Sequence, residues 1–142
     1  RAFVDRMLKL RNPTMANLGN AYYYGVNDRY THYSDARYRT LNLHNLWNGG
    51  KRTVEFRLFE ATTHAGEIRT NILLALSIVR KAMNAKAASA RSQRPYNETS
   101  AKYDLRVFLL RLGWNGEMFK APRKHLLKRM PGSAAWKNGR QD

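Results

Sequence analysis

The stretch RTVEFRLFEATTHAGEIRT, residues 52–70, decides the fold class of this chain. In its first half, apolar residues alternate with polar ones, which is typical of a β-strand that buries one face. Glu55 and Arg57 therefore fall side by side on the polar face of this strand. Its second half predicts the start of an α-helix. The stretch indicates a strand that leads directly into a helix, with a carboxylate and a guanidinium just before the helix begins.

A second alternating segment, residues 39–47, lies just upstream and predicts a partner strand. The sequence NGGK at 48–51 predicts a tight turn between the two strands, because Asn and Gly tolerate positive φ angles. The strands then form an antiparallel hairpin with one apolar and one polar face. The polar face is expected to carry Asn42, His44, Glu55 and Arg57.

A long helix is predicted over residues 65–86. Thr63 or His64 can cap it, and Glu67 lies in its first turn, where negative charge is favoured. Its apolar stripe is expected to be buried against the apolar face of the hairpin. The stripe consists of Ile68, Ile72, Leu76, Val79 and Met83, and Leu74 and Ile78 widen it.

The remaining segments complete an α+β fold, in which an antiparallel hairpin is backed by the long buried helix and C-terminal helices. Further helices are predicted over residues 1–10, 14–24, 101–114 and 119–132, and a loop over 26–38. We expect three regions: the C-terminal part of a catalytic domain (1–86), a polar linker (87–100) and a basic helical segment (101–142).

Composition limits the classes of protein to consider. The 142 residues suit one domain of modest size, and the absence of cysteine excludes disulfides and thiolate metal sites. No apolar run is long enough to span a membrane, so we expect a cytoplasmic protein without a membrane partner. The net charge of +16 has two readings: a polyanionic partner such as nucleic acid or nucleotide, or a surface made soluble by basic residues.

The polar face of the hairpin suggests a chemical role. A carboxylate is a hard oxygen ligand suited to magnesium, and a guanidinium two residues on can hold phosphate oxygens bidentately. The other reading is a salt bridge on a solvent-facing sheet. The histidines lack zinc-ligand spacing, and we find no P-loop, dinucleotide fingerprint or nucleophile turn.

The C-terminal segment offers a second candidate site. Residues 118–141 contain seven Lys or Arg and no acidic residue. They either bind a polyanion or form the solvated face of a short helix, and no RNA-binding signature decides between the two. The candidate polyanion-binding residues are Lys120, Arg123, Lys124, Lys128 and Arg129.

Three segments together resemble the amidoligase enzymes of bacteria and their phages, which belong to the glutamine synthetase and glutamate–cysteine ligase fold group. They are RYRTLNLHNLW (37–47), TVEFRLFEATTHAGEIRTNILLALSIV (53–79) and YDLRVFLLRLGWNGEMFKAPRKHLLKRMPG (103–132). The resemblance implies an antiparallel sheet curved around an ATP site, as in a glutamine synthetase-like half-barrel, with helices behind it. It also implies that ATP phosphorylates a carboxylate and that an amine displaces the phosphate to form an amide.

The resemblance also implies roles for individual residues, with ATP and Mg²⁺ as cofactors. Glu55 and Arg57 match a strand Glu and Arg that bind metal and the transferred phosphate, and Arg37 is expected to assist with phosphate. The remaining matches are expected to line the cleft for the carboxylate and amine substrates. They are Tyr38 in the R-Y pair, Asn42 and His44 in L-N-L-H, and His64 in H-A-G-E.

One feature departs from the family pattern. Family members carry a G-x-E-x-E-type strand in an N-terminal portion, which supplies further metal-binding carboxylates, and this chain contains none. We therefore expect the chain to be the C-terminal portion of a ligase, completed by the same protein or another chain, unless the site is inactive. The alternatives are a non-catalytic module that binds nucleic acid or a ribonucleoprotein, and a structural subunit of a larger assembly.

Overall fold

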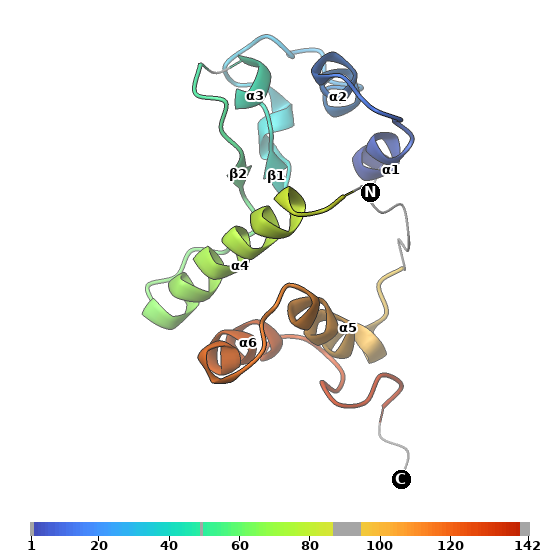
Figure 1. The fold of residues 1–142 in the computed structure, drawn as a ribbon. Coiled ribbons are helices and arrows are strands. Elements are labelled where there is room, and N and C mark those ends of the chain that lie inside the picture. Colours follow the sequence, from blue (N-terminus) through green and yellow to red (C-terminus); the bar gives the residue numbers. More distant parts are fainter. Residues whose placement is uncertain (1, 49, 87–94, 140–142) are drawn as a thin grey trace. The chain divides into compact units, whose positions relative to one another are not determined.

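A computed structural model describes residues 2–48, 50–86 and 95–139 (Figure 1). The chain forms two compact units, Arg1–Glu60 and Ala61–Asp142, each described here by itself. The elements are helices and a small antiparallel sheet, so the fold is α+β, as the sequence predicts. The boundary between the units precedes the long helix, not the segment 87–100 expected to be a linker. Of that segment, 87–94 lies outside the described residues.

The first unit combines short helices with a two-stranded sheet. Its elements are α1 (Ala2–Leu8), α2 (Met15–Tyr22), the 3₁₀ helix η1 (Asp35–Tyr38), β1 (Leu41–Asn42), α3 (Asn45–Asn48) and β2 (Glu55–Phe56). The predicted helices near the N-terminus are confirmed. In the segment 26–38, predicted to be a loop, η1 adds one short helical turn.

Local chemistry explains where α2 begins and how it packs. The Thr14 hydroxyl accepts from the Asn17 backbone at 3.2 Å, and the Asn17 side chain accepts from the Thr14 backbone at 3.1 Å, which forms a capping box. One turn on, a Cβ built on Gly19 would lie 2.9 Å from Nε1 of Trp47. Gly19 therefore lets the indole lie directly against α2, where Nε1 donates to the Met15 carbonyl at 3.0 Å.

Aromatic rings form the core of this unit. Tyr22 is fully buried and Tyr23 is 4% exposed. Trp47 stacks on Tyr22 with ring centroids 5.4 Å apart, and Phe3 meets the same ring edge-on at 5.5 Å. Such aromatic pairs add to the free energy gained by burying their area. The core thus ties α1, α2 and α3 together behind the sheet.

The sheet is shorter than the sequence predicts. β1 and β2 contain two residues each, and the predicted tight turn at 48–51 is wrong: the connection runs from residue 43 to 54 and includes α3. The cause is the Asn42 side chain, whose Oδ1 accepts from the His44 backbone N–H at 2.9 Å. A side chain that bonds the backbone in this way competes with the strand ladder and starts a turn.

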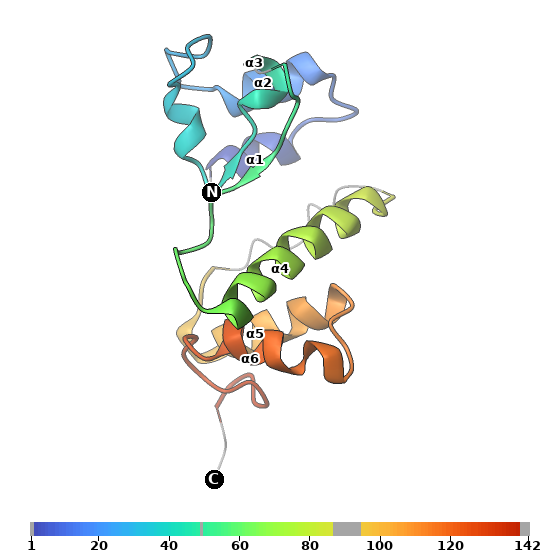
Figure 2. The same ribbon diagram turned by 90° about the vertical axis from the view of Figure 1, so that its left-hand side faces the viewer.

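The second unit is helical, with α4 (Ala65–Met83), α5 (Glu98–Arg111), η2 (Glu117–Phe119) and α6 (Lys120–Leu127) (Figure 2). All three predicted helices are confirmed, with bounds shifted by at most five residues. α6 packs against both α4 and α5. None of the described helices has the length and apolar character needed to cross a bilayer.

The buried face of α4 is only partly the predicted one. Thr70 and Leu74 are its buried residues; Leu74 lies at the edge of the predicted stripe, while the five central residues of the stripe are exposed at 40–80%. α4 is apolar on two sides, and the side that carries Thr70, Leu74 and Ser77 faces the core of its unit. The exposed residues are Ile68, Ile72, Leu76, Val79 and Met83. Packing of α4 on the hairpin stays a prediction.

Trp114 is the centre of the second core. It is fully buried, as is Leu109 in the last turn of α5. The indole Nε1 donates to the Ser77 hydroxyl at 2.8 Å, and the ring stacks on Phe119 with centroids 5.4 Å apart. Ser77 lies on α4, Leu109 lies in the last turn of α5, and Phe119 lies just before α6. Trp114 therefore connects the three helices.

Candidate functional site

The two strands bring Glu55 and Asn42 directly opposite each other. They form a register pair, so their side chains share one face, as the alternation predicts. Nδ2 of Asn42 donates to Oε2 of Glu55 at 2.7 Å, and Nε of Arg57 lies 3.7 Å from the other carboxylate oxygen. The Glu55 side chain is 50% exposed. The Glu55 carboxylate is therefore fixed by Asn42 and still accessible to solvent.

Arg57 connects this carboxylate to the R-Y pair upstream. Its guanidinium lies 5.2 Å from the centroid of the Tyr38 ring, and its Nη1 donates to the Arg37 carbonyl at 2.9 Å. The Arg37 guanidinium itself donates to the His32 carbonyl at 2.6 Å. The structure thus brings Glu55, Arg57 and Tyr38 together, and Arg37 adjoins them through its backbone.

Asn42 is a buried support of this group. It is 2% exposed, so only its amide nitrogen serves the Glu55 carboxylate. The Tyr22 hydroxyl supports Asn42 on its buried side. The hydroxyl donates to the Ala36 carbonyl at 2.6 Å and accepts from the Leu43 backbone N–H at 3.0 Å, and its oxygen lies 3.4 Å from Oδ1 of Asn42. Burial raises the pKa of Tyr22, which keeps this hydroxyl protonated.

His44, predicted to line the cleft, lies in the core and is 2% exposed. Its Nδ1 is 2.6 Å from the Tyr23 hydroxyl oxygen, which also accepts from the Asn48 amide at 2.8 Å. Nε2 has no hydrogen bond of normal geometry among the described residues. Burial is the main cause that lowers the pKa of His44, and the Thr31 backbone opposes it.

This buried imidazole predicts a loss of stability in mild acid. Because the pKa of His44 is lowered in the folded state, the unfolded chain binds the proton more readily. The free energy of unfolding should therefore be constant above about pH 6.5 and fall as the pH drops below that value. Urea titrations between pH 8 and pH 5 measure this. His44→Asn, which keeps an acceptor but cannot titrate, should flatten the slope.

The fit of these residues to a metal can be judged from the donor set. Among the described residues, no group of three or more His, Cys, Asp or Glu could hold a metal ion. Glu55 alone offers an accessible carboxylate at this site. Mg²⁺ is commonly bound by one or two carboxylates together with water and substrate phosphates. The site therefore fits one protein ligand to a magnesium–nucleotide complex and does not fit a metal held by protein alone.

His64, also predicted to line the cleft, belongs to the second unit. It caps α4: its Nδ1 accepts from the Glu67 backbone at 3.3 Å. Its ring packs against His125 of α6 with centroids 5.0 Å apart, and a Cβ on Gly66 would lie 2.7 Å from Nε2 of His125. The motif H-A-G-E thus sets the start of α4 and its close contact with α6.

Glu67 completes this contact. Its carboxylate accepts from Lys128 and from the Thr62 hydroxyl, the latter at 2.8 Å. The hydrogen bond from Lys128, followed by that from Thr62, lowers the pKa of Glu67 to about 2. An ionised carboxylate at this position also suits the N-terminal end of a helix. Glu67 is therefore accounted for by the docking of α6 on α4.

The predicted polyanion-binding residues of α6 are partly engaged within the unit. Arg123 donates to the Trp114 carbonyl at 2.5 Å, Lys128 pairs with Glu67, and Lys120 lies 3.6 Å from a carboxylate oxygen of the exposed Glu117. Arg129 helps to lower the pKa of Glu67. Lys124 is exposed on the same helix. Arg123 and Lys128 therefore have structural roles that the charge pattern did not reveal.

Two supporting groups were not predicted from the sequence. The Tyr22 hydroxyl positions Asn42 and hence Glu55, and His125 packs against His64. Tyr22 stands in the run AYYYG, where the three tyrosines look alike, and only helical periodicity could have separated buried from exposed rings. His125 is 61 residues from His64, and no local pattern links them.

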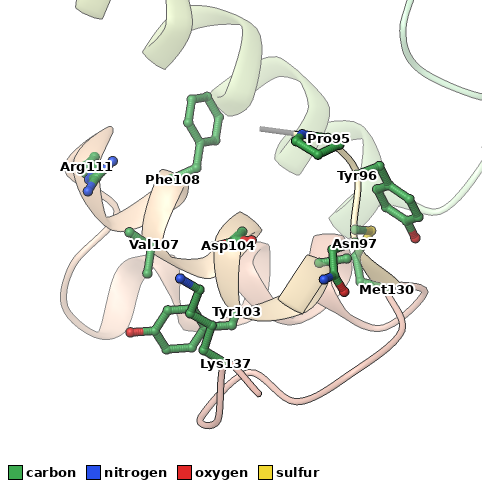
Figure 3. Close-up of a pocket in the computed structure, with 11 residues that line it drawn as sticks. Pro95, Tyr96, Asn97, Tyr103, Asp104, Val107, Phe108, Arg111, Met130 and Lys137 are labelled. Atoms are coloured by element: carbon green, nitrogen blue, oxygen red, sulfur yellow. The ribbon is translucent and has the colours of Figure 1, made fainter. Parts of the chain in front are cut away.

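A hollow among the described residues is separate from these groups. It has a volume of about 520 Å³ and runs along α5 in the second unit, and none of the predicted site residues lines it. Figure 3 shows Arg111 and Phe108 toward one end, Pro95 and Asn97 toward the other, and Asp104 between them. The Asp104 carboxylate already accepts from the Ser100 hydroxyl at 2.7 Å. This hollow lends no support to chemistry at Glu55.

Comparison with known proteins supports the resemblance seen in the sequence. Residues 1–79 match the family described as "Putative amidoligase enzyme", and this region contains the strand pair, the R-Y pair and most of α4. No curated protein and no solved structure gives a significant match. The match covers more than half of the chain. The chain therefore belongs to this amidoligase family.

Proposed function

We propose that this chain forms part of an ATP-dependent ligase that joins a carboxylate to an amine through an acyl-phosphate. The observation that carries the proposal is the group formed by Glu55, Arg57 and Asn42, in which a half-exposed carboxylate is held beside a guanidinium. Family membership supports ligase chemistry at the coarser level. The proposal includes a larger glutamine synthetase-like sheet, to which β1 and β2 would belong.

The chemistry requires charge neutralisation more than covalent help from the protein. A carboxylate oxygen of the substrate attacks the γ-phosphorus of ATP, the bond to the bridging oxygen breaks, and ADP leaves. The amine then attacks the acyl carbon, loses a proton and expels inorganic phosphate, leaving an amide. Positioning and electrostatic stabilisation supply most of the catalysis in such transfers.

Each residue has a distinct part in this proposal. Glu55 would hold the Mg²⁺ that accompanies ATP, and this ion would neutralise phosphate charge. Arg57 would bind the transferred phosphoryl group, because a guanidinium offers paired N–H donors to phosphate oxygens. Tyr38 fixes the guanidinium plane by stacking, and Asn42 fixes the Glu55 carboxylate. Asn42 is thus a positioning residue.

Substitution of Glu55 tests the proposal in the protein that carries residues 1–142. The assay incubates carboxylates with ATP, Mg²⁺ and hydroxylamine, an amine that traps an acyl-phosphate as a hydroxamate. Glu55→Gln keeps the shape and a hydrogen bond to Asn42 but removes the charge. We expect hydroxamate formation to fall by about a hundredfold, comparable to the loss of one electrostatic contact to a transition state.

Two further variants make this test specific. Glu117→Gln removes an exposed carboxylate of the second unit, 90% exposed, and should leave the rate unchanged. Arg57→Lys keeps the charge but loses the paired donors, and it should be slower than wild type. Wild-type rates in Glu55→Gln would contradict the proposed role of the carboxylate.

A further inference from the structure

A short segment of the first unit places an unusual number of tyrosine rings in solvent. Tyrosine usually buries much of its ring in a folded protein, as Tyr22 and Tyr23 do here. Just after them, four tyrosines are exposed at 69–82%. They are Tyr24, Tyr30, Tyr33 and Tyr38. These four rings are not part of the core of the unit, so a partner can contact them.

Cationic groups accompany these exposed rings. The Arg29 guanidinium lies 5.4 Å from the centroid of the Tyr30 ring, and the Arg57 guanidinium lies 5.2 Å from that of Tyr38. Arg and Tyr side by side attract both the charge and the flat face of a partner. This pairing recurs in binding surfaces that combine electrostatic attraction with stacking.

Hydrogen bonds link Arg37 and Arg57 to the segment and fix Arg29 on α2. The Arg37 guanidinium donates to the His32 carbonyl at 2.6 Å, next to Tyr33, and Arg57 donates to the Arg37 carbonyl at 2.9 Å. Arg29 is held from below, because its Nη1 donates to Oδ1 of Asn20 at 2.9 Å. Each guanidinium carries five N–H donors, which these bonds do not exhaust. The arginines are thus fixed in place and can still donate to an anion.

The acidic residues in the segment do little to oppose an anion. The Asp28 carboxylate accepts from the Ser34 hydroxyl at 3.2 Å and from the Asp35 backbone at 2.8 Å, so it serves the loop itself. Residues 24–39 contain three Arg and two Asp, within a chain of net charge +16. The net charge of +16 of the whole chain therefore favours a polyanion.

We propose that this tyrosine–arginine surface binds single-stranded nucleic acid, with bases stacked on the tyrosine rings and phosphates held by the arginines. The surface consists of Tyr30, Tyr33, Tyr38, Arg29, Arg37 and Arg57. A single strand is favoured over a duplex because its bases can turn their faces outward to an aromatic side chain. The segment presents no long helix or β-ribbon, which duplex readers insert into the major groove.

This binding does not require ligase activity, although Tyr38 and Arg57 would belong to both sites. It differs from polyanion binding by α6, because the attraction comes from exposed rings as much as from charge. Stacking on tyrosine tolerates any base, so the expected binding is nearly independent of sequence. It should also weaken as salt rises, because the phosphates release counterions on binding.

Fluorescence anisotropy with a labelled oligothymidylate of about 12 nucleotides tests the proposal. The double variant Tyr30→Ala, Tyr33→Ala removes two rings that are mostly solvated, so it should fold normally, which circular dichroism checks. We expect its affinity to fall by about tenfold or more, as expected for lost base stacking. The matched control Tyr30→Phe, Tyr33→Phe keeps both rings and should bind within about threefold of wild type.

Four outcomes would overturn the proposal. One is unchanged binding by the alanine double variant. Another is a loss that appears with Lys120→Ala, Lys124→Ala instead, which would place the binding on α6. The third is binding of a duplex as tightly as of the single strand. The fourth is no binding of any oligonucleotide, which would favour a protein partner. Ligase assays of the same variants keep the two proposals distinguishable, since neither Tyr30 nor Tyr33 has a part in the ligase site.

Discussion

Trp114→Ala is expected to destabilise the second unit by about 3–5 kcal/mol, as is usual for removal of a fully buried tryptophan. The indole fills the space between three helices, so its loss leaves a cavity lined by Leu109, Phe119 and their neighbours. It also leaves the Ser77 hydroxyl without the donor that reaches it at 2.8 Å. Whole domains are commonly stable by about 5–15 kcal/mol, so this loss would remove a large share.

Urea denaturation followed by circular dichroism measures the effect of Trp114→Ala. Trp136 provides the matched control because it is 57% exposed, and Trp136→Ala should change stability by less than about 0.5 kcal/mol. Trp114→Phe should fall between them, since it restores most of the ring area but not the indole N–H. A wild-type midpoint for Trp114→Ala would show that the helices do not depend on this side chain.

Tyr22→Ala should have an effect of similar size on the first unit, about 3–5 kcal/mol. The fully buried ring packs against Phe3 and Trp47, so the substitution opens a cavity. The lost hydroxyl also leaves the Leu43 N–H without its acceptor and removes one of the two donors to the Ala36 carbonyl. Because this hydroxyl supports Asn42, the hydrogen bond from Asn42 to Glu55 should loosen as well.

Two measurements separate these effects of Tyr22. Tyr22→Phe keeps the ring and removes only the hydroxyl, so it should cost about 1–3 kcal/mol, the usual penalty of unpaired buried polar groups. Hydrogen exchange of the Leu43 amide should accelerate in both variants. Tyr24→Ala, at an exposed ring, is the control and should leave exchange unchanged. Slow exchange of Leu43 in Tyr22→Phe would contradict the support role.

Much of this architecture follows from short-range sequence signals. The start of α4 at His64 depends on the cap and on Glu67, all within four residues. The shared face of Asn42 and Glu55 follows from the period of two along a strand. Strand length could not be predicted in the same way, because β1 ends where the Asn42 side chain takes the His44 N–H. That bond looks no different in sequence from an ordinary strand position.

Burial of α4 was mispredicted for a physical reason. The helix is apolar on two sides, and periodicity cannot say which side meets the core. The choice is made by Trp114, which bonds Ser77 and so turns Thr70 and Leu74 inward, while Ile72 faces outward. Likewise, the sequence predicts that Lys128 is a cation available to a polyanion. Its ammonium instead lies against Glu67, 61 residues away.

The contact between His64, Gly66 and His125 affects how related sequences should be interpreted. H-A-G-E is easily taken as a mark of catalysis, yet here His64, Gly66 and Glu67 each help to dock α6 onto α4. A descendant that had lost Glu55, and with it ligase chemistry, would still need this motif in order to fold. Genome surveys that assign enzymatic activity from H-A-G-E would therefore count inactive descendants as enzymes, whereas Glu55 and Arg57 are the positions that should be inspected.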